Sequence, residues 1–193
     1  MAPFILPKFT MLYFLLLVGC ISFNSEDTVL ERSANFRPYW IGSDVKIEKG
    51  TDVVIVYTVT DVHRLEIAAQ QAQFEGRAKM GDLVFQRILK TWKLPSGELG
   101  DKITSESTTH WQERLKIDRD VPNSFKATYW EYKEKSSVEG TRTYYQIWSL
   151  FNVKYWLFQD YSCGLLRKLS LSSDKEISTF AQARVKDCSL DAE

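Results

Sequence analysis

The stretch DVVIVYTVT, Asp52 to Thr60, decides the fold of this 193-residue chain. Its β-branched residues, bounded by Gly50 before it and Asp61 after it, predict a β-strand. Because both faces of this strand carry apolar side chains, we expect it inside a sheet and not at an edge. Asp61 then stands where a following helix needs a cap, and that helix is expected to run to about Thr91.

The residues after Asp61 repeat with the period of a helix. The side chains on one helical stripe are apolar or small: Leu65, Ala68, Ala72, Gly76, Met80, Leu83 and Ile88. Small residues dominate the first half of the stripe, so we expect this half to approach the sheet closely. Gly76 and Gly81 each cost about 1 kcal/mol within a helix, and tertiary packing must offset that cost. The turn-forming KLPSGELG, residues 93–100, ends the helix.

Strand patterns return after the helix. SFKATYWEYKEK, residues 124–135, and TRTYYQIWSLFNVKYW, residues 141–156, flank SSVEG and predict a long hairpin. The segment before the hairpin, residues 101–120, begins rich in serine and threonine and is predicted as a weaker strand. A capping box at residues 173–176 opens a last helix that runs to about Lys186.

These elements predict a single domain over residues 37–193, since no internal repeat or proline-rich linker divides them. The expected class is α+β, with the long helix and the C-terminal helix packed on a mainly antiparallel sheet. The charge is balanced, with 25 Lys and Arg against 25 Asp and Glu. This balance argues against a nucleic-acid partner.

The amino-terminal residues 1–19 have the form of a signal peptide. Lys8 and the free amino terminus precede an apolar stretch of about 15 residues, which is short of the roughly 20 that span a bilayer. LVGC, ending at Cys20, resembles the lipobox of bacterial lipoproteins. The resemblance implies that the thiol of Cys20 is diacylglycerated, that the chain is cut before it, and that fatty acids such as palmitate anchor the protein to a membrane. The alternative is ordinary secretion, with cleavage after Ser22.

The residues after the lipobox indicate which membrane holds the protein and how the domain is connected to it. Ile21 and Ser22 stand in place of the aspartate that commonly retains lipoproteins in an inner membrane, so the resemblance implies the outer membrane. Residues 20–36 are polar and without periodicity, and are expected to form the lipidated amino terminus and a flexible tether.

Two cysteines remain if Cys20 is acylated, namely Cys163 and Cys188. An exported chain lies in an oxidising compartment, where an even pair favours a disulfide that closes a loop of about 25 residues. The alternative is two small buried side chains without a bond.

The residue types of catalytic and metal sites are sparse. The only histidines are His63, expected in the first turn of the long helix, and His110, which stands among hydroxyl residues in TTHWQE. Neither has metal-ligand spacing, so no metal or cofactor is expected. IDRD, residues 117–120, lacks the rest of a calcium loop and is interpreted as a solvated turn. Cys163 as a nucleophile would need a histidine beside it.

A family resemblance rests on four segments. RPYWI at residues 37–41, the strand after it, the helix opening LEIAAQQAQFEGRAK and the strand YYQIWSLFNV are similar to the small twenty-kilodalton Lpp-type envelope lipoproteins. The same segments resemble the N-terminal domain of the flagellar assembly protein T. The resemblance implies a helix packed on a sheet, no enzyme activity, and a scaffolding or assembly role in the cell envelope.

The sequence therefore predicts a lipid-anchored, non-catalytic cell-envelope protein that binds another envelope protein. The alternative is a secreted or anchored module that binds a small ligand in a pocket lined by the aromatic strands. A third hypothesis is a hydrolase that uses His110 or Cys163.

Overall fold

The structure of the chain is a computed structural model that describes residues 27–42, 52–118, 124–137 and 140–189. The elements are β1 (Thr28–Arg32), β2 (Val53–Val62), α1 (Leu65–Trp92), α2 (Glu98–Asp118), β3 (Phe125–Ser137), β4 (Gly140–Val153), α3 (Tyr155–Leu169), α4 (Lys175–Val185) and a 3₁₀ helix, η1 (Lys186–Ser189). The strands form one sheet in the order β1-β3-β4-β2, and every neighbouring pair is antiparallel. The predicted α+β class is confirmed.

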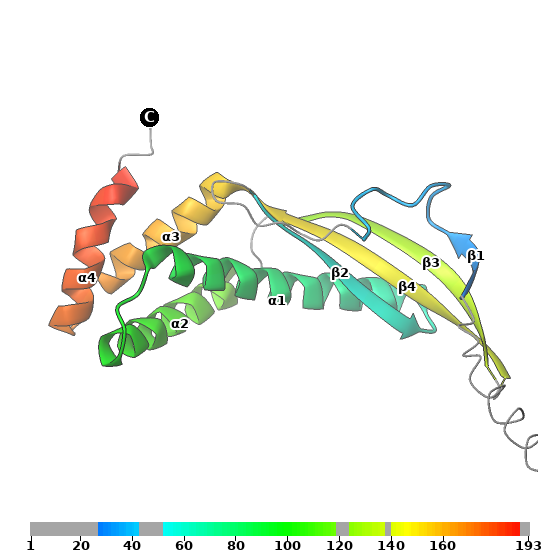
Figure 1. The fold of residues 1–193 in the computed structure, drawn as a ribbon, viewed down its shortest axis with the longest axis horizontal. Coiled ribbons are helices and arrows are strands. Elements are labelled where there is room, and N and C mark those ends of the chain that lie inside the picture. The colour runs from blue at the N-terminus through cyan, green and yellow to red at the C-terminus, as the bar shows by residue number, and fades with distance from the viewer. Residues whose placement is uncertain (1–26, 43–51, 119–123, 138–139, 190–193) are drawn as a thin grey trace, which may run out of the picture.

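Figure 1 shows the sheet at one end of the molecule and helices α2, α3 and α4 at the other. Helix α1 has 28 residues, about 42 Å at 1.5 Å per residue, and belongs to both ends. Its first half lies against β2 and β4, where Ala68 and Ala72 pack with Val59 and Ile147. The buried side chains of its second half join the main core with the other helices: Met80, Val84, Phe85, Ile88 and Trp92.

Helix α1 approaches the sheet closely at Gly76. A Cβ placed on Gly76 would overlap the ring of Phe151 in β4. Phe151 is fully buried, and its ring meets that of Phe125 at a centroid distance of 5.8 Å. The helix backbone therefore rests directly on an aromatic ring that has little room to move, and the predicted stripe of small residues has this physical role.

The predicted hairpin is confirmed as β3 and β4, whereas the predicted position of β2 is wrong. We expected β2 inside the sheet, but it is an edge strand that pairs with β4 alone. Only one of its faces is buried under α1, and Thr58 and Thr60 on the other face are exposed. β-Branched residues suit any strand surface, so their presence on both faces did not require burial of both faces.

Residues 101–120 were predicted as a weak strand, and this is wrong, since the segment from Glu98 to Asp118 is helix α2. Ile103, Ser107 and Trp111 are buried at a spacing of four residues, which is a helical stripe. The Ser107 hydroxyl donates to the Ile103 carbonyl oxygen at 2.6 Å, and Thr104 and Thr108 make the same bond four residues back. Hydroxyl residues that satisfy themselves in this way are tolerated inside a helix.

Three other expectations differ from the structure. Residues 28–32, placed in the flexible tether, form strand β1 on the edge of β3. Asp61 does not cap α1, because it lies in β2 with φ of 63° and pairs with Arg142 at 3.3 Å, while Arg64 holds the cap position. Helix α4 is present as predicted, but Asp174 is its cap, and it packs on α3 and α2, far from the sheet.

We predict that Gly76→Ala lowers the free energy of unfolding by about 1–3 kcal/mol, because overpacking against Phe151 outweighs the helix propensity of alanine. The matched control is Gly164→Ala in α3, where an added Cβ would meet only the Nη1 end of the Arg114 side chain, at 3.1 Å. Urea unfolding should separate the two variants, and Phe151→Leu added to Gly76→Ala should recover stability. A Gly76→Ala protein as stable as the control would contradict the close packing.

Candidate functional site

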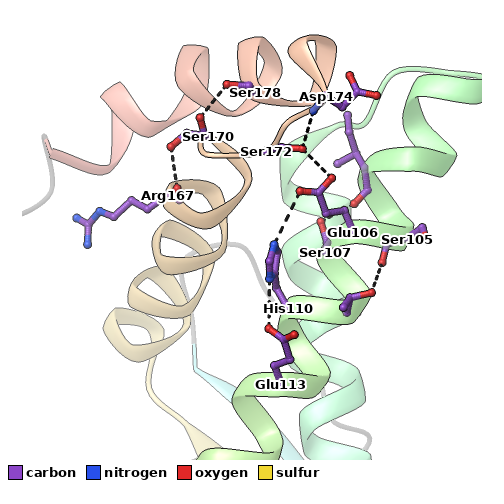
Figure 2. A network of polar contacts seen from close by, with 12 residues as sticks. Ser105, Glu106, Ser107, His110, Glu113, Arg167, Ser170, Ser172, Asp174 and Ser178 are labelled. Atoms are coloured by element: carbon purple, nitrogen blue, oxygen red, sulfur yellow. Dashed lines mark hydrogen bonds and ion pairs between the residues drawn. The ribbon is translucent and has the colours of Figure 1, made fainter.

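The best candidate for catalysis in the sequence, His110, lies in a polar network between α2 and the α3–α4 connection (Figure 2). Its Nε2 is 3.8 Å from Oε1 of Glu106, and its Nδ1 is 3.5 Å from Oε2 of Glu113. Glu106 also accepts a hydrogen bond from the Ser172 hydroxyl at 2.9 Å. Ser172 in turn accepts from the backbone N–H of Asp174, the α4 cap, at 3.2 Å. The network therefore fastens α2 to the start of α4.

This geometry differs from that of a hydrolase. In a serine or cysteine hydrolase the imidazole takes the proton of the nucleophile, so the two must be hydrogen-bonded. Here Ser172 donates to a carboxylate, and the two ring nitrogens of His110 face the carboxylates of Glu106 and Glu113. Within the described ranges no group of three or more His, Cys, Asp or Glu residues is arranged to hold a metal ion. The contacts around His110 are those of a packing network.

Cys163 and Cys188 are joined by a disulfide, with Cα atoms 5.8 Å apart. The bond connects α3 to η1 across a sequence separation of 25 residues. The sequence left this pairing open against two unbonded cysteines. In the bonded form Cys163 has no thiolate, and a thiolate is what a cysteine nucleophile requires.

The remaining candidates from the sequence are dispersed. Cys20 lies outside the described residues, as do Arg119 and Asp120 of IDRD, whose first two residues end α2. His63 was expected in the first turn of α1 but lies before it, exposed, with Nδ1 3.1 Å from the carbonyl oxygen of Thr143. The sequence candidates are thus not assembled into one site.

A charged cluster that sequence reasoning missed lies on the sheet face opposite α1. Glu131 of β3 is 4% exposed, and its carboxylate is 3.5 Å from Nε of Arg37 and 3.3 Å from Nζ of Lys133. The Tyr129 hydroxyl donates to Glu131 at 3.1 Å, and burial together with this bond raises the pKa of Tyr129. The Arg37 guanidinium lies 4.9 Å above the Trp148 ring centroid. The sequence signal for this cluster was Glu131 itself, which shares one face of its strand with the aromatic Tyr129, since a buried glutamate needs a charged or hydrogen-bonded partner.

Arg37 belongs to a segment that we call the strap, residues 33–42. Ser33 begins the strap and makes two hydrogen bonds with the backbone of Trp130, both at 3.0 Å. Its N–H donates to the Trp130 carbonyl oxygen, and its hydroxyl oxygen accepts from the Trp130 N–H. From there the strap crosses the face of the sheet opposite α1 (Figure 1). Arg37 points onto the sheet, but its neighbours Phe36 and Tyr39 are 85% and 94% exposed. The strap therefore presents two aromatic side chains to solvent.

The residues before the strap are tied to the same face. The Tyr144 hydroxyl in β4 donates to the carboxylate of Asp27, next to strand β1. Burial and this bond raise the pKa of Tyr144 to about 12. The described amino-terminal segment, residues 27–42, is thus attached to the sheet by Asp27, by β1 and by Arg37.

The aromatic residues of the strands pack on each other. Trp130 and Tyr132 both contact Tyr145, with ring centroids 5.8 and 4.8 Å apart, and Tyr129 contacts Trp148 at 5.7 Å. These contacts fill the space between neighbouring aromatic side chains of the strands. The structure describes a cavity of about 510 Å³ elsewhere, beside the end of α1 and between α3 and η1.

Asp52, just before β2, fixes the start of α3. Its Oδ1 accepts from the backbone N–H of Tyr155 at 3.1 Å, and its Oδ2 accepts from Nζ of Lys154 at 2.6 Å. Lys154 holds the cap position of α3 but makes no side-chain cap bond. A carboxylate about 100 residues away in sequence therefore performs the capping, for which helix N-termini provide unsatisfied donors. The hydrogen bond from Lys154 is the main cause that lowers the pKa of Asp52.

Comparisons of the chain with models of protein families, with curated proteins and with solved structures give no match. Among the helices that the structure describes, none combines the length and apolar content needed to cross a membrane. The resemblance to Lpp-type envelope lipoproteins stays an expectation.

We predict that Asp52→Asn lowers the free energy of unfolding by about 1 kcal/mol at pH 7, since the carboxylate is partly exposed and its ionic bond is only partly screened. The folded-state pKa of Asp52 is lowered, so its contribution is present above the unfolded pKa of about 3.9 and lost as pH falls through the folded value. The difference from the unmodified protein should therefore shrink at acidic pH.

The matched control for this prediction is Asp61→Asn, at the other end of β2, where the Asp61–Arg142 pair has side chains 53% and 56% exposed. It should change stability by less than about 0.5 kcal/mol. Equal, pH-independent losses in both variants, measured by urea unfolding from pH 3 to 8, would contradict the role of Asp52.

Proposed function

We propose that this chain is a lipid-anchored, non-catalytic protein of the cell envelope, attached to the outer membrane through Cys20, and that it binds a partner protein through the strap. The observation that carries the proposal is the exposure of Phe36 and Tyr39 on a segment that is held in place. Aromatic side chains are enriched at protein interfaces and dominate their binding energy.

The way in which the strap is held supports a binding role. Burial of Glu131 costs desolvation energy, and its ion pair with Arg37, whose side chain is 51% exposed, returns little of that energy as stability. The ion pair does, however, fix the direction of the strap, with the side chain of Arg37 toward the sheet. Phe36 and Tyr39 on either side are then presented without the entropic cost of ordering a loose segment on binding.

The position of the strap in the sequence suits a partner at a membrane. Ser33 follows Cys20 by 13 residues, which span at most about 45 Å when fully extended. In the proposed anchored state the strap lies within that distance of the lipid. Its partner is therefore expected to be an envelope protein at the same surface.

The non-catalytic part of the proposal is supported by the contacts of the two candidates for catalysis. His110 faces the carboxylates of Glu106 and Glu113, and Cys163 is bonded to Cys188. A small-ligand role is the second candidate function, and the cavity beside α3 favours it.

The anchor predicts the mass of the mature amino terminus. Mass spectrometry of the protein purified from membranes should find a chain that begins at Cys20 and carries acyl groups, and Cys20→Ser should abolish both the cut and the acylation. An unmodified chain that begins at Phe23 would contradict the anchor and support plain secretion.

The partner surface predicts site-specific crosslinking in cells. A photo-crosslinking residue at Phe36 should yield a defined adduct with an envelope protein, whereas the same residue at Leu171, also 85% exposed but in the α3–α4 connection, should not. Arg37→Gln should weaken the Phe36 adduct, because the strap then loses its ionic contact with Glu131. Adducts with lipid only, or the same proteins at both positions, would contradict the proposal.

A further inference from the structure

The cavity of about 510 Å³ lies in the helical end of the molecule, away from the strap. This volume is within the range of small-molecule sites, about 300–1,000 Å³. Its inner wall is apolar, formed by Trp92, Phe158 and Leu166, which are at most 5% exposed. Trp156, 66% exposed, stands at its edge. Aromatic walls of this kind bind apolar chains and rings.

Two arginines on the lining give the cavity a positive side. Arg184 is held in place, since its Nε donates to the carbonyl oxygen of Trp92 at 3.2 Å and its guanidinium lies 3.8 Å from the Phe180 ring centroid. Arg167 is exposed, and its side chain points away from the His110 network (Figure 2). The acidic lining residue, Asp160, is 3.7 Å from Nη2 of Arg114. Among the lining residues that the structure describes, two arginines and one aspartate therefore give a net charge of +1.

The disulfide holds the cavity in shape. Cys163 in α3 and Cys188 in η1 both line it, so the bond fixes the distance between two of its walls. Trp92 is also fixed, because its Nε1 donates to the Ser162 hydroxyl at 2.8 Å. A preformed cavity binds ligands without the cost of ordering its walls.

We infer that this cavity binds a small anionic amphiphile, that is, a carboxylate attached to an apolar chain or ring. The apolar part lies against Trp92, Phe158 and Trp156, and the carboxylate accepts charge-assisted hydrogen bonds from Arg167, with Arg184 as the second cation of the lining. This function is separate from partner binding by the strap, since no residue of the strap lines the cavity.

The test is calorimetric titration of the protein purified with its native amino terminus and held in lipid nanodiscs, with empty nanodiscs as the blank. The probes are decanoate and 4-phenylbutanoate, which separate an acyl-chain ligand from an aromatic one. We expect saturable binding of at least one of them, and weaker binding of decyltrimethylammonium, which carries the opposite charge. Equal affinity for the cation, or no saturable binding of either carboxylate, overturns the inference.

Variants of residues on and off the lining test whether the ligand binds in this cavity. Arg167→Gln should weaken the carboxylate about tenfold, the typical effect of a lost charge-assisted hydrogen bond. Its control is Lys168→Gln, the next residue of α3, exposed but not on the lining. Trp156→Ala should also weaken binding, whereas Phe74→Ala, a 78% exposed aromatic on α1, should stay within about twofold. If Lys168→Gln and Phe74→Ala weakened binding as much as Arg167→Gln and Trp156→Ala, the assignment to this cavity would be overturned. Crosslinking at the strap is a separate experiment, so its result tests the proposed partner binding whatever these four variants show.

Discussion

The contact of Gly76 with the Phe151 ring is the constraint on which the two ends of the molecule depend. One helix, α1, serves both the sheet and the helical end, so the distance at which it crosses β4 sets the position of everything packed on its second half. Small residues at 68, 72 and 76 permit that distance, and the larger Met80, Val84 and Ile88 join the main cluster, which contains residues of the other helices together with Phe151 and Val153 of β4. A single change of residue size along one stripe thus divides the core into two parts.

Helix α3 depends on a second set of restraints, each from a different part of the chain. Asp52 holds its first turn, the disulfide to Cys188 holds its middle, and the Ser170–Ser178 contact at 2.7 Å joins its end to α4. Because these restraints are a covalent bond and directional hydrogen bonds, they tolerate less adjustment than apolar packing does. The cavity beside α3 can therefore keep its shape without a ligand to fill it.

Sequence reasoning predicted the correct element wherever the apolar side chains recur with the period of that element and are also the side chains that are buried. The stripe of α1 and the two arms of the hairpin follow that rule, and so does the class of the fold. Helix α2 was missed because its buried stripe includes Ser107, whose hydroxyl bonds within the helix, so composition suggested a strand. Strand β1 was missed because it is an edge strand whose residues are largely exposed and polar. The Arg37–Glu131 and Asp52–Tyr155 contacts join residues about 100 apart in sequence, and local patterns carry no information on such pairs.

Strand β1 has a mechanical consequence in the proposed anchored state. Any pulling force between the lipid and the domain reaches the described residues at Asp27, so it acts first on the hydrogen bond from Tyr144 and then on the hydrogen bonds between β1 and β3. The bonds of Ser33 to Trp130 come next along the chain, and the ion pair of Arg37 with Glu131 follows. These attachments are in series, and each must yield before the force reaches the following one. The strap would then be released before the hairpin or α1 is strained, which makes the presentation of Phe36 and Tyr39 sensitive to tension.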